Sequence, residues 1–448
     1  MNWVAILVAL LALATPAAAA DDDDDDRDRH PNILVIVSDD QGSWDYSFTG
    51  NPRMPTPNID RLADEGLRLT RFYSEPWCAP TRAAMQTGTS PGTWGYDSPL
   101  DFGIPAGTFT IARRFQEAGY RTALVGKWHA GTGPAHPNAM GYEHFYGHLG
   151  AVIDYVNHTA GGRLDWQRNG VDVVEEGYST DLLTEEAVDL IERRDDRPFF
   201  LVLSYNAPHG GPNWVTPELA ARYCAAPTFP YNCGYFAAVQ QMDLGIGRVL
   251  DALEREGLEK NTLVVFFSDN GGPFFNLPPL RGRKFHALEG GIRVGALVRW
   301  HGKVRRGESD VPMHVRDLWA TLEAAAKLDR RAPAEGNDLW REVRGKRRQP
   351  RAAPLNPIFS TNRPHPCFLC CCFVGPFQAW ARQSAMIDGR WKLLLNERVF
   401  QEILLHTGRS VELFDVVADP GETVDRSGDE PERAAAMLDA LLRHEGRR

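Results

Sequence analysis

Three features are missing from this sequence of 448 residues, and each absence argues against a class of protein. The formal net charge is −10 and no basic face is apparent, which argues against a nucleic-acid-binding protein. After residue 20 no segment is long and apolar enough to cross a bilayer, which argues against later membrane spans. The cysteine cluster CFLCCC at 367–372 lacks a second, spaced cysteine pair, so we expect disulfides or buried thiols there rather than zinc.

The first thirty residues differ in composition from the rest of the chain. Residues 1–20 form a short apolar run that ends in small residues, which is typical of a signal peptide. The lack of Lys and Arg near its start leaves an uncleaved membrane anchor as the alternative. Residues 21–30 include six consecutive Asp residues and predict an acidic, flexible segment. We expect an exported protein (secreted, periplasmic or lumenal) with no stable membrane insertion of the mature chain.

Export changes the interpretation of the cysteines. In an oxidising compartment Cys224 and Cys233, nine residues apart, are candidates for a disulfide. A second group with the same capacity consists of Cys367, Cys370, Cys371 and Cys372. Cys78 remains as the odd cysteine, and an odd cysteine in an exported protein requires an explanation.

Four short apolar runs have the length and the β-branched or aromatic content of buried parallel strands. They are residues 32–38, 122–126, 199–206 and 262–268. Helical patterns lie between them, beginning after Thr56, at a cap formed by Ser179 or Thr180, and near Tyr235. This alternation predicts an α/β fold with a doubly wound, mainly parallel central sheet flanked by helices.

Beyond residue 300 the composition changes. Residues 300–365 are rich in Arg, Pro and Ala, and we expect a connector and a surface helix there. Two later segments, SAMIDGRWKLLLN and VELFDVVADPGE, predict strands of a small antiparallel sheet. We therefore predict a main domain at 31–345 and a C-terminal subdomain at 346–448.

Oxygen donors follow two of the predicted strands. Asp39 and Asp40 follow the first strand, and Asp269 and Asn270 follow the fourth. In open parallel sheets ligands bind outside the carboxyl ends of the strands, so we expect these groups to converge. Three carboxylates and an amide suit Ca²⁺ or Mg²⁺ and not a soft metal. The alternative is that these residues only end strands and cap helices, but such a cluster of like charge without a cation is costly.

Basic side chains come from separate segments of the same region. They are Lys127, His129, His209 and Lys284. Each alone is more often a surface lysine or a hydrogen-bonded histidine than a functional group. Together with a divalent cation they predict a pocket for an anion, with donors for a tetrahedral oxyanion.

The position of Cys78 favours unusual chemistry. Pro80 suits the first turn of a helix, so Cys78 is expected near the positive end of that helix and close to Arg82. We expect this environment to lower the pKa of the thiol. A soft sulfur beside a hard-cation site is nevertheless a poor match, which suggests that the residue is not used as sulfur.

These residues resemble those of the sulfatases, a family of the alkaline-phosphatase-like superfamily. Cys78, Pro80 and Arg82 fit the C-x-P-x-R signature within CAPTRAAMQTG, and GYRTALVGKWH at 119–129 fits the second signature. Further similar segments are SDDQG, GYEHFYG, SDNGG, EGGIRV and LFDVVADPGE. The resemblance is dense over residues 30–300 and sparse in the tail, and it implies a sulfatase catalytic domain with a small C-terminal antiparallel subdomain.

The resemblance also implies a mechanism. Cys78 would be oxidised to formylglycine by a formylglycine-generating enzyme, and one hydroxyl of the aldehyde hydrate would attack sulfur while the other expels sulfate. The implied Ca²⁺ ligands are Asp39, Asp40, Asp269, Asn270 and residue 78 itself. Arg82 and His129 would hold the hydrate, and the implied sulfate contacts are Lys127, His209 and Lys284. His209 or Lys284 would protonate the leaving alcohol.

Some positions depart from the family pattern. Phe285 and His286 stand where small residues or Thr are usual, and we expect them to reshape the substrate side. Two alternatives to an aryl or carbohydrate sulfatase remain at this stage. One is a phosphonate or phosphate ester hydrolase of the same superfamily, and the other is an inactive protein that binds sulfated glycans with Cys78 unconverted. The natural substrate and the oligomeric state do not follow from the sequence.

Overall fold

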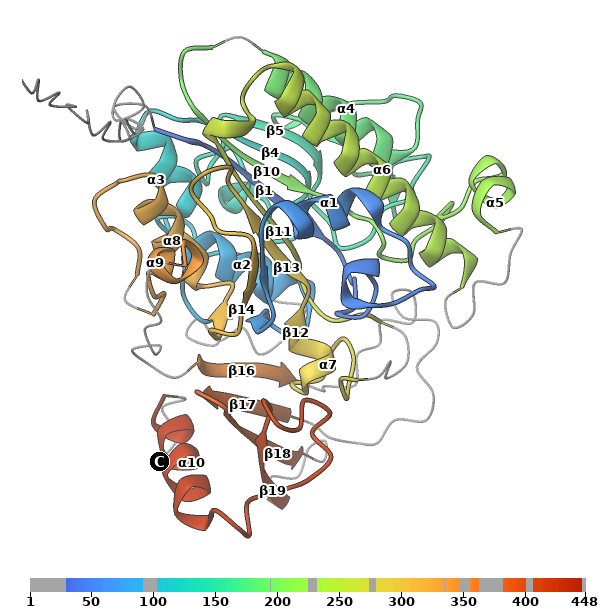
Figure 1. The fold of residues 1–448 in the computed structure, drawn as a ribbon. Coiled ribbons are helices and arrows are strands. Elements are labelled where there is room, and N and C mark those ends of the chain that lie inside the picture. Colours follow the sequence, from blue (N-terminus) through green and yellow to red (C-terminus); the bar gives the residue numbers. More distant parts are fainter. Residues whose placement is uncertain are drawn as a thin grey trace, which may run out of the picture. The chain divides into compact units, whose positions relative to one another are not determined.

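Four buried strands form the parallel centre of a large sheet (Figure 1). The computed structural model describes residues 30–91, 103–193, 195–224, 232–273, 279–333, 335–345, 355–361, 382–399 and 406–444. The central strands run in the order β11 (Thr262–Ser268), β1 (Asn32–Ser38), β10 (Phe199–Ser204) and β4 (Arg121–Lys127). Each agrees with a predicted apolar run to within two residues at either end.

Shorter strands extend this sheet on both sides. On the β4 side they are β5 (His144–His148), β8 (Gln167–Arg168) and β9 (Val171–Asp172). On the β11 side they are β13 (Ala296–Arg299), β2 (Leu67–Leu69) and β14 (Gly307–Ser309). β13 pairs antiparallel with β11, and β8 pairs antiparallel with β5. The predicted parallel arrangement is therefore confirmed for the centre, whereas the outer strands make the sheet mixed.

Helices cover both faces of the sheet because side chains alternate along each central strand. In β1, Ile33 and Val35 belong to one hydrophobic core, and Leu34 and Ile36 belong to the other. The first core contains side chains of α2 (Cys78–Thr87), α3 (Ile111–Glu117), α8 (Asp317–Ala325) and α9 (Trp340–Val343). The second contains side chains of α1 (Pro57–Glu65), α4 (Ser179–Glu192), α5 (Pro217–Tyr223) and α6 (Cys233–Arg255). This confirms the doubly wound α/β prediction.

Two details of the helix predictions are wrong. The N-cap of α4 is Tyr178, and no side chain caps this helix, because the Ser179 hydroxyl instead pairs with the Asn206 side chain. Helix α8 lies in the stretch that we expected to hold a surface helix. It is buried instead, since Leu318 and Trp319 pack into the first hydrophobic core.

The C-terminal part forms a separate four-stranded antiparallel sheet, as predicted. Its strands are β16 (Leu355–Thr361), β17 (Arg382–Asp388), β18 (Trp391–Val399) and β19 (His406–Asp415). Helix α10 (Pro431–His444) packs on it through Met437 and Leu441. Residues Pro31–Arg448 cluster as one compact unit, and the division between 345 and 346 stays a prediction.

The remaining elements are short. They are helix α7 (Glu289–Ile292), strands β3 (Phe72–Tyr73), β6 (Thr159–Ala160), β7 (Arg163–Leu164), β12 (Arg293–Val294) and β15 (Met313–His314), and the 3-10 turns Ser47–Thr49, Gly133–Ala135 and Glu259–Asn261. A disulfide joins Cys224 to Cys233, one of the pairings considered from the sequence. In the described part of the chain no helix has the length and apolar character needed to cross a membrane. The predicted signal peptide at 1–20, nearly all of the acidic segment at 21–30 and the cysteines at 367–372 lie outside the described residues.

Candidate active site

Four oxygen-donor residues meet where β1 and β11 end. The two strands pair in parallel register up to Ser38 and Ser268, so the residues that follow lie side by side. The Asp40 backbone N–H donates to Asp269 Oδ1 at 3.1 Å, and Asn270 Nδ2 donates to Asp40 Oδ1 at 2.7 Å. Asp40 has a φ of 68°, a left-handed conformation that Asp tolerates better than most residues. Asp39, Asp40, Asp269 and Asn270 are all buried.

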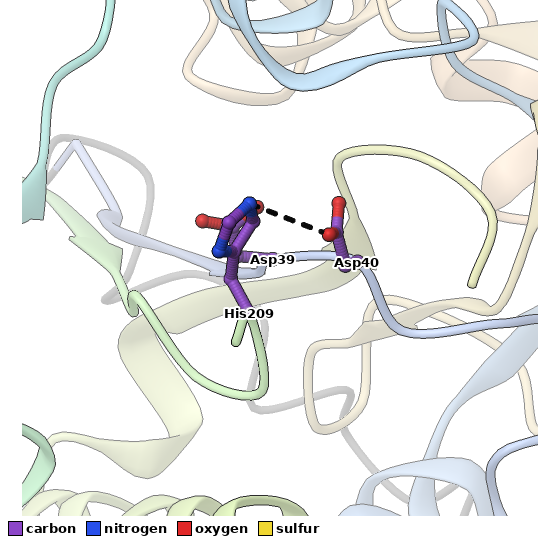
Figure 2. Close-up of side chains that lie close together, drawn as sticks. All are labelled: Asp39, Asp40 and His209. Atoms are coloured by element: carbon purple, nitrogen blue, oxygen red, sulfur yellow. Dashed lines mark ion pairs between the residues drawn. The ribbon is translucent and has the colours of Figure 1, made fainter. Parts of the chain in front are cut away.

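Three basic side chains face these acids from other segments. Lys127, the last residue of β4, places Nζ 2.5 Å from Asp39 Oδ2. Lys284 places Nζ 2.7 Å from Asp40 Oδ1. His209 follows β10, and its Nε2 lies 3.5 Å from Asp40 Oδ2 (Figure 2). The structure thus brings together residues that lie as much as 245 positions apart in the chain, as 39 and 284 do.

Helix α2 contributes Cys78 and Arg82. Cys78 is the first residue of the helix, and Arg82 lies one turn further along. Arg82 donates from Nη2 to Asp269 Oδ2 at 2.8 Å and from Nη1 to the Lys127 carbonyl at 3.0 Å. Asp39, Cys78 and Asp269 each present a ligand atom, and these three atoms lie within 4.8 Å of one another. The residues predicted from the sequence therefore form one cluster around the start of α2.

The electrostatics of the acids fit a bound cation. Burial alone would raise the pKa of Asp40, but the charge of Lys284 and the hydrogen bonds from Lys284 and Asn270 lower it to about 2. Burial and the charge of Asp39 raise the pKa of Asp269 to about 6, even though Arg82 opposes this. Asp39 Oδ1 and Asn270 Oδ1 are buried and accept no hydrogen bond. A hard divalent cation would use both oxygens and would keep Asp269 ionised.

Both predicted histidines are buried and electrically neutral at pH 7. Burial and the charges of Lys127 and Arg82 hold the pKa of His129 well below its usual value. Burial also lowers the pKa of His209 to about 3, although Asp40 opposes the shift. The hydroxyl of Tyr155 donates to the His209 carbonyl at 2.7 Å, a contact that no sequence signal indicated.

The predicted pKa of Cys78 is wrong in direction. Burial raises the pKa of the thiol above its ordinary value, in spite of the charges of Lys127 and Lys284. The charges of Asp39 and Asp269 act in the same direction as burial. A helix N-terminus and Arg82 lie nearby, but they do not offset the rise in the pKa of the thiol. The reason is that a thiolate would be desolvated here and would face carboxylates. In the described part of the chain Cys78 is the free cysteine, and it is buried.

Two aromatic rings flank this cluster. Trp77 precedes Cys78, and its ring centroid lies 5.9 Å from that of Phe285 in an edge-to-face arrangement. Lys284 Nζ lies 5.3 Å from the centroid of the same Phe285 ring. Phe285 has a φ of 74°, which is rare for a bulky residue, and its N–H donates to the Pro76 carbonyl at 2.7 Å. The sequence predicted a role for Phe285 on the substrate side, but it did not indicate that Trp77 would pack beside it.

Comparisons with known proteins give one consistent result. The family model described as Sulfatase matches residues 31–328. Arylsulfatase J of Mus musculus is 29% identical over 92% of this chain and 75% of its own length. N-acetylgalactosamine-6-sulfatase of Mus musculus is 31% identical over 66% of this chain, and the match spans 63% of that relative. The crystal structure of Ps i-CgsB in complex with k-i-k-neocarrahexaose has a TM-score of 0.78 and 29% identity, with 93% of each chain covered.

We predict that Arg82→Met destabilises the protein by about 3 to 5 kcal/mol, because it leaves Asp269 buried without its ion-pair partner. Urea denaturation monitored by fluorescence measures this difference. Arg443→Met, which breaks an exposed pair with Asp439 on α10, is the matched control and should change stability by no more than about 0.5 kcal/mol. Equal effects of the two substitutions would contradict a structural role for Arg82 in the cluster.

Proposed function

Because the chain belongs to the sulfatase family, we propose that this enzyme hydrolyses sulfate monoesters with a formylglycine made from Cys78 and a Ca²⁺ ion bound beside it. The observation that carries the proposal is the position of Cys78, whose ligand atom lies within 4.8 Å of those of Asp39 and Asp269. An oxygen at this position suits a hard cation, whereas sulfur does not. The aldehyde hydrate would supply a hydroxyl nucleophile, and Ca²⁺ held by the acids would supply positive charge to the sulfate group.

The charge of the cluster supports an anionic substrate. The carboxylates of Asp39, Asp40 and Asp269 balance the positive charges of Arg82, Lys127 and Lys284. A divalent cation added to this balanced set leaves two positive charges, which favour a sulfate ester and stabilise the dianion that it releases. Asp39, Asp40, Asp269 and Asn270 are the proposed ligands of the cation.

The surrounding residues have separate proposed roles. Arg82 fixes Asp269 and, with His129, holds the hydrated side chain at position 78. Lys127, His209 and Lys284 bind the sulfate group. His209 is neutral, and its Nε2 lies 3.5 Å from Asp40 Oδ2. Before substrate binds, Lys284 is therefore the side chain that already carries a proton for the leaving alcohol. His209 becomes a proton source only after an anion binds.

Carbohydrate sulfates are the favoured substrates. Support comes from the names of similar proteins, which include an N-acetylgalactosamine-6-sulfatase and a protein crystallised with k-i-k-neocarrahexaose. A phosphate or phosphonate ester hydrolase is the rival activity, because its substrates are also tetrahedral anions. We further propose that residues 1–20 direct export and that a formylglycine-generating enzyme converts Cys78 during maturation.

The central test compares wild-type protein with Cys78→Ala. We expect the wild type to hydrolyse an aryl sulfate faster than the matching aryl phosphate, and Cys78→Ala to lose activity by about 1,000-fold or more, because the nucleophile is removed. Mass spectrometry of the peptide containing position 78 should show an aldehyde in place of the thiol. An unconverted thiol together with no turnover of either ester would instead support a sulfated-glycan-binding protein.

Metal removal gives a second prediction. A chelator should abolish hydrolysis, and Ca²⁺ at about 100 times its Kd should restore it and stabilise the fold by about 2.7 kcal/mol. Asp39→Asn should weaken Ca²⁺ binding by about 10-fold or more, because the site loses one of its charged ligands. Thermal unfolding with and without Ca²⁺ measures both effects, and Asp439→Asn on the exposed face of α10 is the control. A melting temperature of the wild type that does not change when Ca²⁺ is added would contradict the metal proposal.

The Phe285 ring provides a test of the substrate side. We expect Phe285→Ala to lower kcat/KM for a ring-bearing sulfate ester by about 10-fold, because the ring loses its packing partner beside Lys284. A small alkyl sulfate, which cannot reach the ring, should be affected far less. Phe109→Ala is a suitable control, since Phe109 is 39% exposed and contacts Trp319 in another part of the fold. Equal losses for large and small esters would show that Phe285 does not contact the substrate.

A further inference from the structure

A second cluster of buried charges lies between α7 and the C-terminal sheet. Lys392 in β18 is fully buried, and its Nζ lies 3.1 Å from Glu289 Oε1 and 2.8 Å from Glu422 Oε1. Both glutamates are also fully buried. Glu289 belongs to the EGGIRV segment and Glu422 to the LFDVVADPGE segment, so Lys392 joins two motifs to which the proposed chemistry assigns no role.

This cluster holds the first residue of α7 from several directions. The Glu289 N–H donates to Glu422 Oε2 at 2.8 Å, and the Tyr73 hydroxyl donates to Glu289 Oε2 at 3.2 Å. Arg281 donates from Nη1 to the Glu422 carbonyl at 2.6 Å. Lys392 lies between the two carboxylates. Without Lys392 the two negative charges would face each other in a buried environment, and only part of their charge would be compensated.

Helix α7 in turn contacts the backbone of the active site. The Gly271 N–H, directly after Asn270, donates to the Gly291 carbonyl at 2.9 Å. A Cβ atom at Gly271 would lie 2.0 Å from the Gly290 carbonyl oxygen, so the two backbones touch. The Gly290 N–H donates to the Arg281 carbonyl, and the Lys284 N–H donates to the Gly272 carbonyl at 3.0 Å. A movement of α7 would therefore displace Lys284 relative to Asp40.

The C-terminal sheet supports the same loop by packing. The Ala287 N–H donates to Gln383 Oε1 at 3.2 Å. Ala287 and Leu288 form a hydrophobic cluster with Ala385, Leu394, Phe414 and Val416 of the C-terminal part. The loop that carries Lys284 is thus fixed on one side by the sheet and on the other by the backbone that follows the acids.

We propose that Lys392 is a positioning residue for the active site: by pairing with Glu289 and Glu422 it fixes α7 and, through α7, the loop that carries Lys284. This inference rests on the proposed function, since it assigns Lys284 to the bound sulfate ester. The C-terminal sheet then acts on catalysis without contributing a group that touches the substrate.

The test is a double-mutant cycle on kcat/KM for an aryl sulfate. Lys392→Met should lower kcat/KM by about 10- to 100-fold, as is usual for residues that orient catalytic groups, while Lys392→Arg should recover part of the loss. In a Lys284→Met background the same Lys392→Met change should cost less than about 3-fold, because the group that it positions is already absent. Arg390→Met, which removes an exposed guanidinium two residues before Lys392 and its ion pair with the partly buried Asp415 of β19, should leave activity unchanged.

A full loss from Lys392→Met in the Lys284→Met background would overturn the proposal, because it would show that Lys392 acts on overall stability. If Lys392→Met does not fold, Glu422→Gln is measured in the same cycle and interpreted in the same way. Hydrogen exchange gives a readout that does not depend on activity. Lys392→Met should speed exchange in residues 281–292 and leave that in β1 unchanged, and unchanged exchange in 281–292 would also overturn the inference, even if the wild type cleaves no sulfate ester.

Discussion

The burial of three carboxylates at one edge of the sheet is the constraint on which the rest of the site depends. Asp39, Asp40 and Asp269 have almost no contact with solvent, and isolated buried charges of this kind cost several kcal/mol each. They persist because each one has a cationic or hydrogen-bonding partner at short distance. Two oxygens, on Asp39 and Asn270, accept no hydrogen bond, and the proposed cation would complete the compensation there.

The side chains that compensate the buried carboxylates come from different layers of the fold, so the same contacts connect the site to the fold. Arg82 brings helix α2 against β11, Lys127 is the last residue of β4, and Lys284 holds the loop before α7 against β1. The same contacts therefore stabilise the tertiary structure and place the groups proposed to react. A parallel sheet suits this arrangement, since all of its central strands deliver their carboxyl ends to one edge.

The sequence revealed those parts of the fold that local patterns determine. The apolar runs predicted β1 and β11 residue for residue, and the polar residues after them converged as the parallel-sheet rule requires. Burial is not a local property, so the direction of the Cys78 pKa shift and the buried position of α8 were both missed. The Lys392 cluster could not be predicted either. Lys392 and Glu289 are 103 positions apart, and their local sequences carry no sign of contact.

Burial of Cys78 bears directly on why a sulfur atom would be replaced at this position. The environment that assembles a hard-cation site also raises the pKa of the thiol, so at neutral pH the residue remains the protonated, weakly nucleophilic form. Burial is the main cause of this shift, and the carboxylates of Asp39 and Asp269, which are the groups proposed to hold the cation, act in the same direction. An oxygen nucleophile avoids this conflict, since it needs no ionised sulfur and is itself a ligand that a hard cation accepts. Under the proposed function, oxidation of the side chain would let one cluster hold the cation and provide the nucleophile.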